Sequence, residues 1–277
     1  MSPLITSQLD QIVIFSLVLT RIGMLVFILP MFGSSSVPMQ ARAILAIAIA
    51  LILTPVYAGA LPSPPENLMM LGLMLARESM LGLALGLAVM ILLAGMQLAG
   101  SIISQMSGMT LADVANPTFD TSVPIFSQLL EMLSLAIFFS LGGHRLVMTA
   151  LLDTFKFMPP GQATFPEEAV EMLATIFTHS FEIGIRAAAP AIISLLLAIL
   201  VVALISRTLP QLNSVAVGLN FNAMIVLAIL ALSLGSAAMV FQEELEPTIV
   251  SITQSILIPS DSQVASETAD LRVYPSE

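Results

Sequence analysis

The chain has 277 residues, of which 57% are hydrophobic and 9% charged, and its mean hydropathy is +1.01. An average soluble domain carries about 25% charged residues, so this composition excludes an ordinary soluble protein and indicates an integral membrane protein. The chain contains no cysteine, which excludes disulfides and thiolate metal sites, and its net charge is −10. Its eight Lys and Arg residues form no basic stripe, so we expect no nucleic-acid partner.

Long apolar runs dominate the sequence, and about 20 apolar residues suffice to cross a bilayer as a helix. They predict an all-α fold with roughly six long helices arranged as hairpins, and a short apolar helix after the fourth, ending near Phe155. Five of the long helices are expected at about residues 11–31, 37–57, 67–100, 124–142 and 213–241. The remaining one, the fifth in chain order, is expected to begin at a start signal at 164–168 and to end at about residue 205. Between the first two, a turn is expected from Phe32 to Ser36.

Charged residues interrupt these apolar runs, where a lone charge is costly unless protein or water faces it. The residues concerned are Arg21, Arg77, Glu78, Glu131, Glu182 and Arg186. The spacing of Glu182 and Arg186, one turn apart, predicts an ion pair. For the whole set, packed pairs between helices or subunits are the favoured interpretation, and a proton or ion pathway is the alternative.

Small residues recur four apart in the third helix, at Gly82 and Gly86, Ala84 and Ala88, and Gly95 and Ala99. Such spacing lets a second helix approach closely, which in a membrane replaces the missing hydrophobic drive for association. We therefore expect this helix to have close neighbours.

Proline and polar residues mark the remaining boundaries. Pro190 predicts a kink in the fifth helix, Pro210 ends it, and Asn213 can cap the sixth, so that the last two helices form a hairpin. Beyond about Ile258 an acidic tail is expected to be weakly ordered.

The stretch from Gly95 to Pro124 breaks the apolar pattern, and its Ser, Gly, Asn and Pro content predicts a loop from Gln105 to Pro124. It nevertheless keeps an apolar set: Ile102, Ile103, Met106, Met109, Leu111 and Val114. Non-helical backbone at membrane depth survives only where protein buries it or where it lines a cavity. The loop is therefore a candidate gate, and an ordinary long extramembrane connection is the alternative.

Several short motifs occur in a characteristic order. They are Arg21, Pro30, Gly33, Val37, Pro38 and Arg42, then Gln105 and Asn116-Pro117, Gly143-His144, Leu151 to Phe155, Ala189-Pro190, and Pro210 to Asn213 with Gly218. Together they resemble the FliR/SctT family, a subunit of the export gate of type III secretion in flagella and injectisomes. The resemblance covers about Gln11 to Ile258.

The resemblance implies a single copy of this chain assembled with several FliP-like and FliQ-like subunits around a central pore. FlhB-like and FlhA-like export components, membrane lipid and unfolded exported proteins are the other expected partners. It implies a location in the bacterial inner (cytoplasmic) membrane, at the flagellar basal body. Within an export-gate domain at 1–258, it divides the chain into a FliP-like part at about 1–186 and a FliQ-like hairpin at about 187–241, followed by the acidic tail at 259–277.

The family's loop that corresponds to Gln105–Pro117 is regarded as a plug in the pore. Here that loop contains Gln105, Met106, Gly108, Met109, Leu111, Val114, Asn116 and Pro117. The positions expected to pack helices or subunits together are Arg21, Pro38, Arg42, Gly82, Gly86, Glu131, Arg186, Pro210 and Asn213. The loop departs from the family pattern, which is often richer in Phe and has Asp before the proline.

Catalytic motifs are not found. His144 and His179 have no metal-ligand spacing to each other or to a carboxylate cluster, and no nucleophile motif or phosphate loop occurs. We therefore expect a non-enzymatic protein with no cofactor or metal. An injectisome export-gate subunit, or a small-molecule or ion secondary transporter, which should show inverted repeats, are the alternatives.

Overall fold

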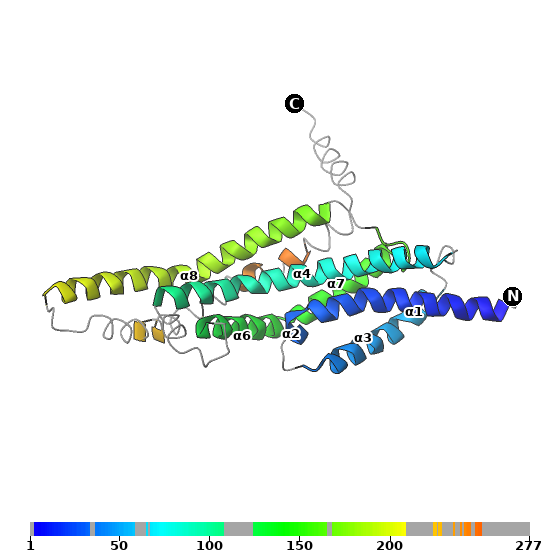
Figure 1. Cartoon of the computed structure of the whole chain (residues 1–277), viewed down its shortest axis with the longest axis horizontal. Helices are drawn as coiled ribbons and strands as arrows, with labels where there is room; N and C mark the ends of the chain where they lie inside the picture. Colours follow the sequence, from blue (N-terminus) through cyan, green and yellow to red (C-terminus); the bar gives the residue numbers. More distant parts are fainter. Residues whose placement is uncertain are drawn as a thin grey trace, which may run out of the picture. The chain divides into compact units, whose positions relative to one another are not determined.

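The computed structural model describes residues 3–33, 37–58, 65, 67–107, 124–164 and 168–208, and scattered positions between 224 and 250. Every regular element in these residues is a helix, and none of them forms a strand (Figure 1). The predicted all-α fold class is therefore confirmed.

The elements, in chain order, are α1 (Pro3–Ile28), α2 (Pro30–Gly33), α3 (Met39–Leu53), the 3-10 helix η1 (Thr54–Tyr57), α4 (Leu68–Ser107), α6 (Ile125–Ser140), α7 (Gly143–Phe157) and α8 (Glu168–Thr208). Contacts divide the described residues into two compact units. Unit 1 contains those within 1–90, 144–176 and 246–277, and unit 2 contains those within 91–143 and 177–245. Both α4 and α8 contribute residues to each unit.

Four described segments are long and apolar enough to cross a membrane: Gln8–Ile28, Met39–Tyr57, Leu68–Ser107 and Val170–Leu204. The broken pair of α6 and α7 makes a fifth if the two helices are one span. The sixth expected helix, at 213–241, lies mostly outside the described residues, although each of its described positions is helical. The described residues thus hold four or five of the six predicted spans.

The first hairpin follows the prediction with two differences. The helix α1 begins at Pro3, ahead of the expected Gln11. Phe32 and Gly33 belong to the one-turn helix α2 and not to a turn, because Pro30 has the fixed φ that suits a first helical position. Pro38 caps α3 with extended backbone, and its carbonyl accepts from the Ala41 amide over 2.9 Å.

The helix α4 extends to Ser107, seven residues past the predicted end at Gly100. The prediction that Gln105 and Met106 lie in a loop is therefore wrong. That prediction was based on the Ser, Gly, Asn and Pro content of the stretch, but here the Ser101 and Ser107 hydroxyls donate to carbonyls three residues earlier in the helix, over 2.8 Å each. Serines that bond to their own helix need no loop to satisfy them.

A glycine ends α6. Gly142 has a φ of 73°, in the left-handed region that ends many helices, and its amide donates to the Phe139 carbonyl over 3.0 Å. By contrast α8 is one continuous helix of 41 residues with Pro190 inside it. The kink expected at Pro190 stays a prediction.

Candidate functional site

A buried ion pair lies in the interior of unit 1. The Nε atom of Arg21, on α1, donates to Oε2 of Glu78, on α4, over 2.6 Å. Both side chains are fully buried, with 0% of their surface exposed. Neither charge therefore faces lipid or water, and each depends on the other and on neighbouring protein groups.

The rest of the Arg21 guanidinium is also occupied. Its NH1 group donates to Oγ1 of Thr154 over 3.3 Å, and its NH2 group donates to the Met158 carbonyl over 3.1 Å. The Phe155 ring centroid lies 4.2 Å from Cζ of Arg21, which places the cation over the negative face of the ring. The guanidinium thus joins α1 to the end of α7 and to the residue that follows it.

The Glu78 carboxylate is held at both oxygens. While Oε2 accepts from Arg21, Oε1 accepts from the Gly161 amide over 2.9 Å. Gly161 has a φ of 86°, a conformation that favours glycine, and it lies in the turn after α7. The pair is therefore electrically neutral and hydrogen-bonded on every side that the structure describes, which favours a packing role over an ion pathway.

Two glycines of α4 permit this arrangement. A Cβ atom added to Gly82 would collide with the backbone carbonyl of Arg21, and one added to Gly86 would lie 3.0 Å from Cβ of Ile28. Gly82 is one turn after Glu78, on the same face of the helix. The close approach of α1 to α4 thus brings Arg21 within reach of the carboxylate.

Glycines serve the same purpose in unit 2. A Cβ atom at Gly184 of α8 would lie 2.6 Å from the Gly95 carbonyl oxygen of α4, and one at Gly100 would overlap the backbone of Phe126 and Ser127 in α6. The Ser127 hydroxyl donates to the Gln97 carbonyl over 3.0 Å. The second half of α4 therefore has close helical neighbours, as small residues in membrane helices permit.

The other residues expected to pack helices have varied surroundings. NH2 of Arg42 donates to the Val37 carbonyl over 3.0 Å, at the start of α3. Glu131 is exposed on α6, and its carboxylate accepts from Nε2 of Gln97 over 3.4 Å. Pro210 and Asn213 lie outside the described residues.

The predicted plug is described only at its start. Gln105 is exposed and Met106 half-buried, both in the last turn of α4. Gly108, Met109, Leu111, Val114, Asn116 and Pro117 lie outside the described residues. The structure resumes at Pro124, which precedes the first residue of α6.

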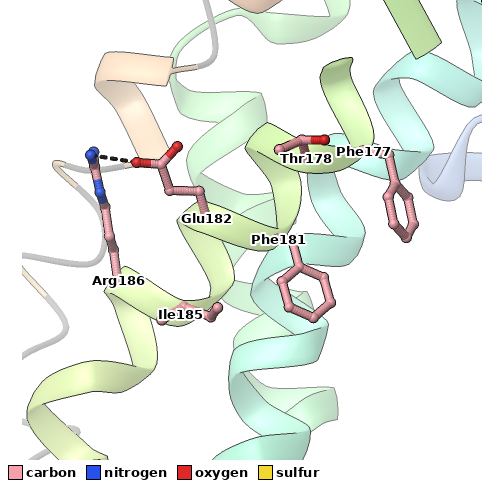
Figure 2. Close-up of a pocket in the computed structure, with 6 residues that line it drawn as sticks. All are labelled: Phe177, Thr178, Phe181, Glu182, Ile185 and Arg186. Carbon is pink, nitrogen blue, oxygen red and sulfur yellow. Dashed lines mark ion pairs between the residues drawn. The ribbon is translucent and has the colours of Figure 1, made fainter. Parts of the chain in front are cut away.

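The predicted ion pair of α8 is present: NH2 of Arg186 lies 2.6 Å from Oε1 of Glu182 (Figure 2). NH1 of Arg186 lies 4.0 Å from Oε1 of Glu244. Beside the pair is an open groove of about 520 Å³, lined by Phe177, Thr178, Phe181, Glu182, Ile185 and Arg186. Both histidines are exposed, and no cluster of His, Asp and Glu among the described residues could hold a metal ion.

Sequence reasoning singled out Arg21 and Glu78 but did not pair them, because they are 57 residues apart. It missed Thr154, Met158 and Gly161, which bond to this pair and with it form what we call the Arg21 cluster. The available signal was the motif from Leu151 to Phe155, which contains Thr154 and the ring under Arg21.

Comparison with known proteins identifies the family. The family described as "Bacterial export proteins, family 1" matches residues 12–248. Flagellar biosynthetic protein FliR of Caulobacter vibrioides is 28% identical over 233 residues, which are 84% of this chain and 93% of that protein. FliR of Bacillus subtilis is 31% identical over 222 residues, 77% of this chain and 83% of that protein.

A relative from another secretion system is more distant. Secretion system apparatus protein SsaT of Salmonella typhimurium is 24% identical over 157 residues, 56% of this chain and 61% of that protein. The family match covers all eight described helical elements at least in part. The chain therefore belongs to family 1 of the bacterial export proteins, the FliR/SctT family that its motifs resemble.

Proposed function

We propose that this chain is a structural, non-enzymatic subunit of a type III protein export gate in the bacterial inner membrane, at the flagellar basal body. The observation that carries the proposal is the family match over residues 12–248, together with FliR relatives aligned over 77% to 84% of the chain. The four apolar helices long enough to span a bilayer suit a membrane-embedded component.

A flagellar role is favoured over an injectisome role. The two FliR proteins are 28% and 31% identical over most of the chain, whereas SsaT is 24% identical over 56% of it. Family membership likewise favours export of proteins over the transport of small molecules or ions, which the sequence alone leaves open.

The partners proposed are FliP-like and FliQ-like subunits, with FlhB-like and FlhA-like components in the larger apparatus. Support comes from the surface that the chain leaves uncovered: only 11% of the apolar window of Met39–Tyr57 and 22% of that of Val170–Leu204 are buried. Glu131 is likewise exposed, on the apolar helix α6, and lipid cannot accommodate such a charge. Neighbouring subunits would cover both.

The loop from Gln105 to Pro117 is proposed as the plug of the pore through which unfolded proteins pass. Its apolar residues Met109, Leu111 and Val114 would keep a closed channel dry. Since α4 extends to Ser107, the movable part begins no earlier than Gly108. Gln105 and Met106 are then the helical base of the plug.

The chain is proposed to combine a FliP-like part at 1–186 with a FliQ-like hairpin at 187–241, followed by an acidic tail at 259–277. The boundary at 186 falls inside α8, which is continuous from Glu168 to Thr208. The two parts would therefore share one helix, with no linker between them.

Native mass spectrometry of the complex purified from its own membranes tests the proposal. The expected result is an assembly with one copy of this chain and several FliP-like and FliQ-like subunits. A stable, isolated monomer of this chain, or an assembly without export subunits, would contradict it.

A further inference from the structure

The groove on α8 lies between two parallel rows of side chains. Phe177, Phe181 and Ile185 form one row, and Thr178, Glu182 and Arg186 form the other, each with members one turn apart. Figure 2 shows the two rings on one side of the helix and the ion pair on the other. A pair of such rows forms a groove of the kind that receives a ridge of side chains from a second helix.

The apolar row is open to its surroundings. Phe177 is 60% exposed, and Phe181 and Ile185 are each 47% exposed, while the two rings are 6.4 Å apart. Large adjacent apolar side chains are seldom left in contact with water. Water alone is therefore a poor occupant for this groove.

The polar row and Glu244 together carry one unbalanced negative charge. Arg186 has two carboxylates near it, Glu182 at 2.6 Å and Glu244 at 4.0 Å. The three side chains stay 58%, 49% and 30% exposed, respectively. One guanidinium cannot balance two carboxylates, so the cluster can accept a further cation.

Lipid is also a poor occupant. The apolar span Val170–Leu204 has sixteen residues before Arg186, at 170–185, and eighteen after it, at 187–204. A bilayer crossing needs about 17–25 residues, so every crossing longer than the eighteen residues at 187–204 contains Arg186, and only the shortest crossings leave it out. An exposed ionic cluster at that depth needs protein or water beside it, since hydrocarbon cannot solvate it.

We propose that this groove binds a membrane helix of a partner subunit that presents apolar side chains to Phe177 and Phe181 and a Lys or Arg to Glu182 and Glu244. The inference rests on the proposed function, because it requires the chain to work within a complex of membrane proteins. The apolar row supplies the packing surface, and the excess carboxylate selects a basic partner. An incoming cation gives each of the two carboxylates a positive neighbour.

Photo-cross-linking in native membranes tests the occupant. The full chain carries p-benzoylphenylalanine in place of Phe181, is expressed with the export apparatus of its own cell, and is irradiated before purification. Mass spectrometry then identifies the adduct. The expected product joins position 181 to a transmembrane peptide of a different subunit, with a Lys or Arg within one helical turn of the linked residue.

Charge variants test the basis of recognition in the same cross-linking background. Glu182→Gln removes the carboxylate that would meet the cation, so adduct yield should fall about tenfold, as expected for loss of one charge-assisted contact. Arg186→Gln breaks the same intrahelical pair but keeps both carboxylates, so the yield should not fall. Asp153→Asn, which removes the exposed ion pair with Lys156 elsewhere, is the matched control and should leave the yield unchanged.

Three outcomes would overturn the inference: adducts to lipid only, adducts to a second copy of this chain, or a partner peptide without a basic residue near the link. Equal losses for Glu182→Gln and Arg186→Gln would also overturn it, because the ion pair would then matter only within the helix. If the chain still co-purifies with FliP-like and FliQ-like subunits in these cases, the proposed function stands without the inference. If it co-purifies with no export subunit, the proposed function itself fails.

Discussion

Arg21 and Glu78 each hydrogen-bond to the segment that follows α7, in addition to forming an ion pair with each other. Arg21 donates to the Met158 carbonyl over 3.1 Å, and Glu78 accepts from the Gly161 amide over 2.9 Å. Their own contact measures 2.6 Å. A change at either residue therefore disturbs three parts of unit 1 at once: α1, α4 and the turn between α7 and α8.

The substitution Arg21→Leu should sharply reduce assembly. It leaves the buried Glu78 carboxylate with the Gly161 amide as its described donor, and removing one member of a buried pair costs about 3–5 kcal/mol. The double variant Arg21→Leu/Glu78→Leu should recover part of this loss, since no unpaired charge remains. Quantification of the assembled complex after mild solubilisation measures both effects. Normal amounts of Arg21→Leu complex that secretes nothing would instead favour an ion-pathway role.

Exchanging the charges should not restore the pair. In Arg21→Glu/Glu78→Arg, the carboxylate at position 21 would face the Met158 carbonyl and the Phe155 ring, both of which repel an anion. The guanidinium at position 78 would face the Gly161 amide, which is a donor. We expect assembly at or below the level of the single variants. Recovery to more than half of wild type would show that only net charge matters.

Gly82→Ala should destabilise the contact between α1 and α4. The added methyl group would collide with the backbone carbonyl of Arg21, and backbone cannot move aside as a flexible side chain can. Overpacking of this kind costs about 1–3 kcal/mol. Gly72→Ala in the same helix is the control, because a Cβ atom there meets nothing within 4 Å. Thermal stability of the purified complex should fall for the first variant only.

Deletion of residues 109–114 should make the membrane leaky while leaving the complex assembled. The six residues lie between the described ends of α4 and α6, so removing them leaves both helices complete. If they seal the pore, ions and small solutes should pass through the shortened protein. Conductance, or growth in the presence of normally excluded small molecules, measures the leak.

A length-preserving control sharpens this test. In Leu111→Ala/Val114→Ala the loop keeps its length but loses apolar bulk, so an intermediate leak is expected. Assembled deletion complexes that stay as tight as wild type would show that the loop is an ordinary connection.

Periodicity and composition were sufficient to predict the all-α fold and the positions of several described helices. The apolar runs located α3, α6 and α8 to within a few residues, because a lipid-facing or buried helix must be apolar along its whole length. The spacing of Glu182 and Arg186 predicted their pair, since residues four apart in a helix are neighbours.

Contacts between residues far apart in the chain could not be predicted from the sequence, for a physical reason. The acidic residue that pairs with Arg21 is determined by how α1 approaches α4. Arg77 and Glu78 are adjacent in sequence but face different sides of α4, so that Arg77 is exposed and Glu78 is buried. The residue at which α4 ends was not predicted correctly either. Ser101 and Ser107 are typical of loops by composition, but in a helix their hydroxyls bond to the preceding turn.

The Arg21 cluster also imposes an order on biosynthesis. Glu78 is made 57 residues after Arg21, Thr154 133 residues after it and Met158 137 residues after it. At about 5–20 residues per second, the ribosome supplies the last of these acceptors roughly 7–27 seconds after the arginine. During that interval the first helix holds a cation whose final surroundings do not yet exist. The first two segments of unit 1, within 1–90 and 144–176, can therefore join only after the segment between them, residues 91–143, has been synthesised.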